Sequence, residues 1–162
     1  MIMNKSKESV KISGLEMDSL AADLFVSEMI LDPRMGGRRI RILKEHHLIH
    51  TLRDIYTISM KQIPQENRHL LYSEEWANIG LCLKDDRKKA QAEFQAATCR
   101  SLGICSVNQD DNSYPLNLRV LEGMPLVLYW KGDLSILGLQ KMPAVAVVGS
   151  RQPTVYLSLI HI

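Results

Sequence analysis

One segment constrains the fold of this chain more than any other: a short apolar strand that runs into a glycine turn. After Pro143, residues 144–148 read Ala-Val-Ala-Val-Val, and Gly149 ends the run. Consecutive small and β-branched apolar residues are typical of a strand buried on both faces, as parallel strands in α/β folds are. The sequence therefore predicts an α/β fold with a parallel sheet.

The residues at the end of this strand suit a phosphate ligand. Gly149 lets the backbone turn and approach a ligand closely, Ser150 supplies a hydroxyl donor, and Arg151 supplies a planar guanidinium that is always charged. A helix that offers its amide groups to an anion is expected next. An apolar tail, residues 157–162, follows instead, and we expect it to be foreign sequence that takes no part in the fold.

Composition narrows the class of protein. The chain has 162 residues, of which 46% are apolar, enough for one average domain or two small ones with a core. The apolar runs are too short to cross a bilayer and no signal peptide opens the chain, so we expect a cytoplasmic protein without membrane contact. Its three cysteines show neither disulfide nor zinc spacing, which predicts buried thiols, no metal and no cofactor.

Charge is unevenly distributed along the chain. The net charge is only +2, yet residues 34–53 carry six Arg and Lys side chains and a single acid, Glu45. Such a stretch either follows a phosphate backbone or forms an ordinary solvated helix face. The candidate DNA contacts in it are Arg38, Arg39 and Arg41.

Periodicity divides the chain into four segments. We expect a flexible N-terminus over residues 1–14, a helical domain over 15–102, the start of a Rossmann-like domain over 103–156, and the foreign tail. Asp32-Pro33 and Gly103 are predicted helix ends. Two of the predicted helices are expected to turn these residues inward: Ile40, Leu43 and His47 in one helix, and Ala90, Phe94, Ala97 and Leu102 in the other.

Strands are expected after Gly103, at residues 104–107 and 126–130. Leu118, Tyr129 and Trp130 are interpreted as core residues rather than base-stacking ones. Asp110, Asp111 and Asp133 lie in turns, where Asp is favoured for local backbone hydrogen bonds rather than as a metal ligand.

Three blocks of sequence together resemble the DNA-processing protein A (DprA/Smf) family. They are Tyr114-Pro115 with Leu118, the strand from Pro125 to Trp130 followed by Lys131-Gly132-Asp133, and Val148-Gly149-Ser150-Arg151 with Thr154 and Tyr156. The resemblance covers about residues 15–156, strongly after Asp110 and loosely before it.

The resemblance implies a sterile-alpha-motif or helix-hairpin-helix domain followed by an extended Rossmann-like domain, here present only in part. It implies a nonenzymatic protein that binds single-stranded DNA, protects incoming DNA and loads the RecA recombinase in natural transformation, as a homodimer when complete. The residues that carry over are Gly149, Ser150 and Arg151, whereas Thr154 and Tyr156 either contact the ligand or pack the turn.

The resemblance is weakest in the helical part. A helix-hairpin-helix usually has a Pro-Gly-apolar-Gly turn, but here Arg34 stands where the first glycine is expected, within Pro33-Arg34-Met35-Gly36. Either this domain contacts DNA through its arginines, or it is a structural or protein-contacting module. A further alternative for the whole chain is a truncated nucleotide-processing enzyme of the lysine-decarboxylase-like phosphoribohydrolase class, whose sheets start in a similar turn.

Overall fold

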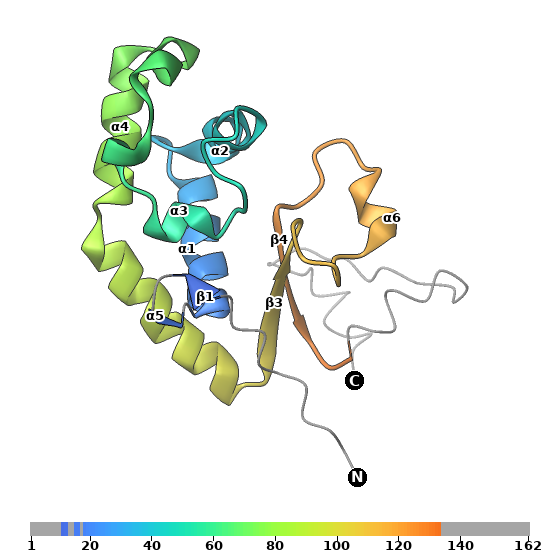
Figure 1. Ribbon diagram of the computed structural model, residues 1–162. Helices are drawn as coiled ribbons and strands as arrows, with labels where there is room; N and C mark the ends of the chain where they lie inside the picture. The colour runs from blue at the N-terminus through green and yellow to red at the C-terminus, as the bar shows by residue number, and fades with distance from the viewer. Residues whose placement is uncertain (1–10, 13–14, 17, 134–162) are drawn as a thin grey trace, which may run out of the picture.

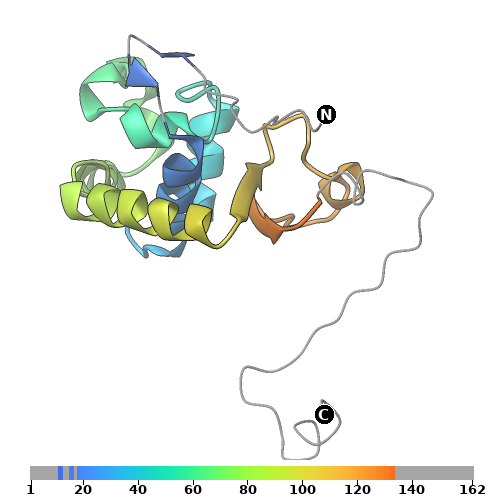
Figure 2. The ribbon, with the colours of Figure 1, turned by 90° about the horizontal axis from the view of Figure 1, so that it is seen from below.

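The computed structural model describes residues 11–12, 15–16 and 18–133. Helices precede a β-hairpin along the chain, and the two lie side by side (Figures 1 and 2). The helices are α1 (Ser19–Leu31), α2 (Gly36–Glu45), α3 (Asp54–Thr57), α4 (Ser73–Leu83), α5 (Asp86–Ser101) and α6 (Leu116–Arg119), with the 3₁₀ helices η1 (Met60–Gln62) and η2 (Gln65–Leu70). The strands are β1 (Lys11–Ile12), β2 (Leu15–Glu16), β3 (Ile104–Asn108) and β4 (Val127–Lys131).

Residues next to the helix ends determine where α1 and α5 begin or end. The carboxylate of Asp18 accepts hydrogen bonds from the amides of Leu20 and Ala21, so α1 begins at Ser19 and not at Leu15, where the apolar pattern begins. Leu15 pairs with Ile12 in the short β1–β2 ladder. The predicted end of α1 before Pro33 and the predicted end of α5 before Gly103, whose φ is +69°, are both confirmed.

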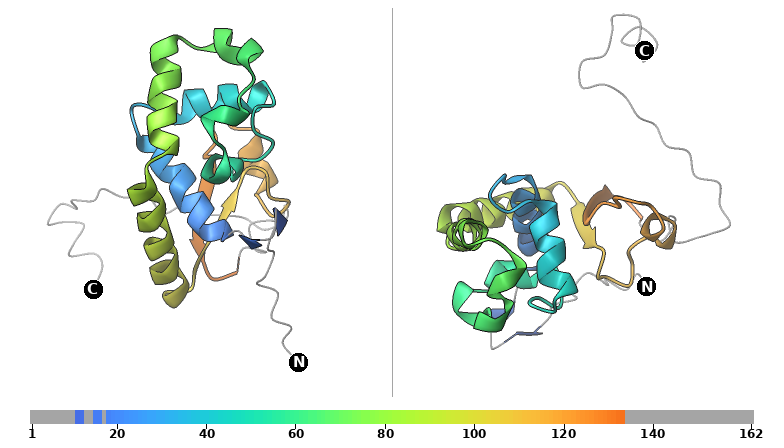
Figure 3. Two further views of the ribbon diagram at one scale, coloured as in Figure 1. Left: turned by 60° about the vertical axis from the view of Figure 1, so that its left-hand side comes forward. Right: turned by 90° about the horizontal axis from the view of Figure 1, so that it is seen from above.

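Helix α1 is the centre of the molecule. It packs against α2, α3, α5 and both strands of the hairpin, and α5 runs alongside it (Figure 3). Phe25 of α1 is fully buried and meets the ring of Tyr56 edge to face, with 5.4 Å between the ring centroids. The rest of this core comes from all parts of the helical region, including Met29, Ile40, Leu43, Ile55, Trp76 and Ile79.

The inward face predicted for α5 is wrong. Ala92 and Ala96 are fully buried, whereas Phe94 is 75% exposed, and Ala90, Ala97 and Leu102 are exposed as well. Small residues line the contact because α1 and α5 lie against each other, and a phenylalanine there would hold the two helices apart. The stripe of α5 that was predicted to face inward, which contains Phe94, therefore faces solvent.

A second inward prediction fails just beyond α2. Ile40 and Leu43 are fully buried as expected, but His47 is exposed. The helix ends at Glu45, and His47 adopts a left-handed conformation with φ of 56°. The helical period that placed its side chain inward therefore no longer applies at this residue.

Strands β3 and β4 form an antiparallel pair in which Ile104 faces Lys131 and Asn108 faces Val127. The α/β expectation holds at the level of helices combined with strands. The parallel arrangement is not found between these two strands, and the strand predicted at residues 144–148 lies outside the described residues. Within the described ranges, no helix has the length and apolarity needed to cross a bilayer.

Aromatic residues fasten the hairpin and the loop within it. The side chain of Tyr129, predicted to be core, is 41% exposed, but its hydroxyl lies 2.7 Å from Ser27 Oγ and donates to the carbonyl of Asp23 on α1. Burial raises the pKa of this hydroxyl to about 12, an effect that the Ser27 hydrogen bond opposes and the charge of Asp23 supports. Tyr114 is 1% exposed and donates to the carbonyl of Pro125 at 2.7 Å, which closes the loop that carries α6.

Candidate nucleic-acid interface

The strongest predicted site lies outside the part of the chain that the structure describes. Gly149, Ser150, Arg151, Thr154 and Tyr156 all follow residue 133, so their roles stay predictions. The structure does describe the basic segment, residues 34–53, and the hairpin that leads toward the predicted turn (Figure 1).

Two of the three candidate arginines of α2 share one carboxylate. Glu75 of α4 lies 3.2 Å from Arg38 and 2.9 Å from Arg39, and Arg39 also donates to the carbonyls of Pro33 and Met35. The amide of Tyr72 donates to Glu75 and, with the charges of the two arginines, holds the pKa of this carboxyl below its usual value. The positive charges of Arg38 and Arg39 are therefore partly neutralised by Glu75 and are less available to a phosphate than the sequence suggests.

Arg41 differs from its neighbours. It is exposed on α2, and among the described residues no hydrogen bond or ion pair engages its guanidinium. Of the three arginines of α2 that were predicted to contact DNA, Arg41 is the one that is exposed and has no carboxylate partner among the described residues.

A second set of charges closes the turn between α1 and α2. The guanidinium of Arg34 binds both oxygens of Asp32, at 3.1 and 2.8 Å, and Lys88 of α5 binds the same carboxylate at 2.6 Å. Asp32 is 7% exposed, and these hydrogen bonds, above all that from Arg34, outweigh burial and hold its pKa far below the usual range. Arg34, which stands where the resemblance led us to expect the first glycine of a helix-hairpin-helix turn, is thus engaged in an ion pair within the chain.

A buried network joins the helices to the hairpin. Asp23 of α1 is fully buried, and its carboxylate accepts two hydrogen bonds from Arg53, at 3.0 and 2.8 Å. It also accepts from Ser106 Oγ at 2.6 Å and from Asn108 Nδ2 at 2.8 Å, both on β3. Arg53 reaches on to both oxygens of Asp111, each at 2.8 Å. Burial disfavours the charge of Arg53, but the bonds and charges of Asp23 and Asp111 outweigh it and raise its pKa.

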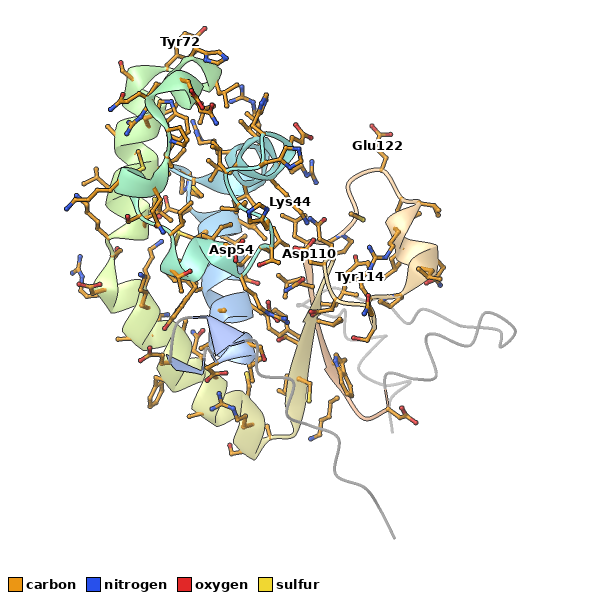
Figure 4. The ribbon with its side chains drawn as sticks, in the orientation of Figure 1. Lys44, Asp54, Tyr72, Asp110, Tyr114 and Glu122 are labelled. Carbon is orange, nitrogen blue, oxygen red and sulfur yellow. The ribbon has the colours of Figure 1, made fainter. Side chains whose placement is uncertain are left out.

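The polar turn after β3 is bound to the helices at a second point. Lys44 of α2 forms an ion pair with Asp110, which also accepts a hydrogen bond from the amide of Leu52 (Figure 4). The local role predicted for these turn carboxylates is confirmed for Asp111, which accepts from the amide of Asn108 at 2.9 Å. The long-range role was not predicted. Within the described ranges, no group of His, Cys, Asp or Glu is arranged to hold a metal ion.

Most of the cations between residues 34 and 53 therefore hold the protein together. Sequence reasoning missed Asp23 because a lone acid inside an apolar helix pattern does not reveal its partner. The sequence did offer one signal. Asp23 falls on the apolar face of the α1 pattern, and an arginine, Arg53, and a turn rich in Asp and Asn lie elsewhere in the chain as possible partners.

The described part of the chain defines an α/β protein in which a helical module is fastened to a β-hairpin by buried ion pairs. A comparison with protein families matches residues 106–161 to DNA recombination-mediator protein A. This match confirms the resemblance seen in the Tyr-Pro, Lys-Gly-Asp and Gly-Ser-Arg blocks, all of which lie within the matched residues. A search of curated proteins and a search of solved structures found no match.

The matched region begins inside β3, at the residue that donates to Asp23. It contains Asp110, Asp111, the whole of β4 and the predicted phosphate residues Gly149, Ser150 and Arg151. It associates the chain with DNA recombination and lends no support to the phosphoribohydrolase alternative.

Proposed function

We propose that this chain is part of a recombination mediator that binds single-stranded DNA, protects incoming DNA and loads RecA in natural transformation. The protein acts in the cytoplasm, without a catalytic step or a cofactor, and as a homodimer when complete. The observation that carries the proposal is the family match over residues 106–161, which spans the predicted phosphate turn.

The chemistry of the turn supports a polynucleotide ligand. A glycine, a hydroxyl and a guanidinium in succession, as in Gly149-Ser150-Arg151, contact backbone phosphate without reading base edges. Thr154 and Tyr156 either add contacts or pack the turn. In the helical part, Arg41 is the favoured secondary contact, because Arg38 and Arg39 would have to exchange Glu75 for a phosphate.

Binding to single strands is tested with Arg151→Ala in the full-length protein. Fluorescence anisotropy with labelled oligonucleotides should show weaker binding for all sequences alike, because a phosphate contact is insensitive to base identity. The dependence of log K on log salt should lose about 0.7 in slope for each phosphate contact removed. We expect the 162-residue chain alone to bind weakly, since one strand and one turn form only one wall of a groove.

Arg87→Ala is the matched control. The Arg87 side chain is 96% exposed on α5 and lies 3.9 Å from Asp85, so its removal deletes the same charge from a different surface. An Arg151→Ala protein that binds as tightly as the Arg87→Ala protein at every salt concentration contradicts the proposed role of the turn.

A further inference from the structure

A groove runs along one side of α4. It has a volume of about 460 Å³ and lies between α4 and the η1–η2 segment, which folds back beside the upper part of this helix in Figure 1. Its lining residues recur at helical spacing on α4, at Ser73, Trp76, Ala77, Gly80 and Leu81, and continue to Lys84, the residue that follows the helix. At 1.5 Å per residue this stripe is roughly 16 Å long, the length of a few residues of peptide.

The middle of the groove is apolar. Trp76, Ala77 and Leu81 line it from α4, and Met60 lines it from η1. A Cβ atom on Gly80 would lie 3.1 Å from Met60 Cγ, so the glycine allows Met60 to approach the helix closely at the floor. Leu81 is 60% exposed, which leaves a large apolar side chain at the rim without a partner in the described residues.

The charged residues of the groove are all cations. Arg68 and Lys84 line it, and no acidic side chain does. Arg68 has no carboxylate partner among the described residues: its guanidinium lies 5.6 Å from the centroid of the Trp76 ring, and its one side-chain bond goes to the carbonyl of Met60 at 3.4 Å. Its Nε is buried and makes no hydrogen bond to any described atom.

We propose that this groove binds an acidic, amphipathic peptide segment of a partner protein, with apolar side chains against Leu81 and Met60 and carboxylates at Arg68 and Lys84. Charge complementarity identifies the occupant, since carboxylates match Arg68 and Lys84 and apolar side chains match the lining between them. A single-stranded nucleic acid fits less well. Trp76 is 3% exposed and is covered by Arg68, so its ring offers no face on which a base can stack.

The groove does not depend on the DNA-binding role proposed above. Its residues lie between Met60 and Lys84, outside the region matched to the recombination-mediator family, and Arg41 is not among them. Loss of peptide binding and loss of oligonucleotide binding are therefore separate outcomes.

The test uses a short fluorescent peptide that carries leucines at the i, i+3, i+4 and i+7 positions of a helix and glutamates between them. Its anisotropy is titrated with the 162-residue chain and with two variants, Lys84→Gln and Leu81→Gln. Both side chains are exposed, so both variants are expected to fold, which far-ultraviolet circular dichroism checks. Arg87→Gln is the matched control, because it removes the same charge from an exposed position on α5 that does not line the groove.

We expect saturable binding that Lys84→Gln and Leu81→Gln each weaken about tenfold, while Arg87→Gln leaves it unchanged. A peptide with lysines in place of the glutamates should not bind. Equal binding of the acidic and basic peptides overturns the proposal, as does an affinity for the acidic peptide that neither groove variant changes. Displacement of the peptide by a single-stranded oligonucleotide, with the same dependence on Leu81, would assign the groove to nucleic acid instead.

Discussion

Replacement of Asp23 by alanine tests whether the buried network holds the hairpin to the helices. The change removes a fully buried carboxylate that binds Arg53, Ser106 and Asn108. Arg53 would keep Asp111 as its only carboxylate, and the two donors on β3 would lose their acceptor within a buried site.

The expected loss of stability follows from these contacts. Removal of one partner of a buried ion pair costs about 3–5 kcal/mol, because the remaining charge stays desolvated. Asp111 still compensates Arg53 in part, which favours the low end of that range, whereas the stranded Ser106 and Asn108 donors act in the opposite direction. We therefore expect Asp23→Ala to lower the free energy of unfolding by about 3–5 kcal/mol, a large part of the roughly 5–15 kcal/mol typical of a domain.

Urea unfolding followed by circular dichroism measures this loss, with Asp86→Ala as the control. Asp86 is exposed in the first turn of α5, so its removal should change the stability by no more than about 0.5 kcal/mol. A double-mutant cycle with Arg53→Ala separates the pair from its surroundings, and Asp23→Ala should cost far less once the arginine is absent. A loss below about 1 kcal/mol for Asp23→Ala in the natural background refutes the reasoning, because it would mean that the carboxylate is not desolvated.

Three further predictions follow from other described residues. The pKa of Asp32 is lowered in the folded state, so its contribution to stability is complete only well above the unfolded pKa of about 4 and is lost progressively as the pH falls below about 5. Asp32→Asn should therefore flatten the acid limb of stability measured by urea titrations. Ala96→Leu should destabilise the protein by about 1–3 kcal/mol by overpacking the α1–α5 contact, whereas Ala97→Leu on the exposed face should be nearly neutral; equal effects would contradict the observed orientation of α5. Gly103→Ala should lower the melting temperature, since alanine at φ of +69° costs about 1 kcal/mol, and an unchanged thermal transition would argue against this helix end.

The sequence predicted the features that depend on neighbouring residues. Pro33 and Gly103 end helices for reasons contained in one or two peptide units, and both ends are where they were expected. The strands at residues 104–107 and 126–130 were also located to within a residue or two, because apolar β-branched runs bounded by turns are local signals.

The missed features depend on partners far away in the chain. The apolar pattern of α5 contains alanines on both faces, and only the closeness of α1 decides that Ala92 and Ala96 face inward while Phe94 does not. Arg39 and Arg53 looked like free cations because their carboxylates, Glu75 and Asp111, lie 36 and 58 residues away. The antiparallel pairing of β3 with β4 is likewise a tertiary choice that neither strand reveals alone.

The placement of Asp23 also has a consequence for the division of the protein into fragments. The region shared with the recombination-mediator family begins at residue 106, but the side chains that begin it complete the bonding of an aspartate more than 80 residues earlier. A chain cut at that family boundary would leave Asp23 without Ser106 and Asn108, and Arg53 without Asp111. The helical module and the hairpin thus depend on each other chemically, and replacement of either part requires that this small set of polar residues be replaced with it.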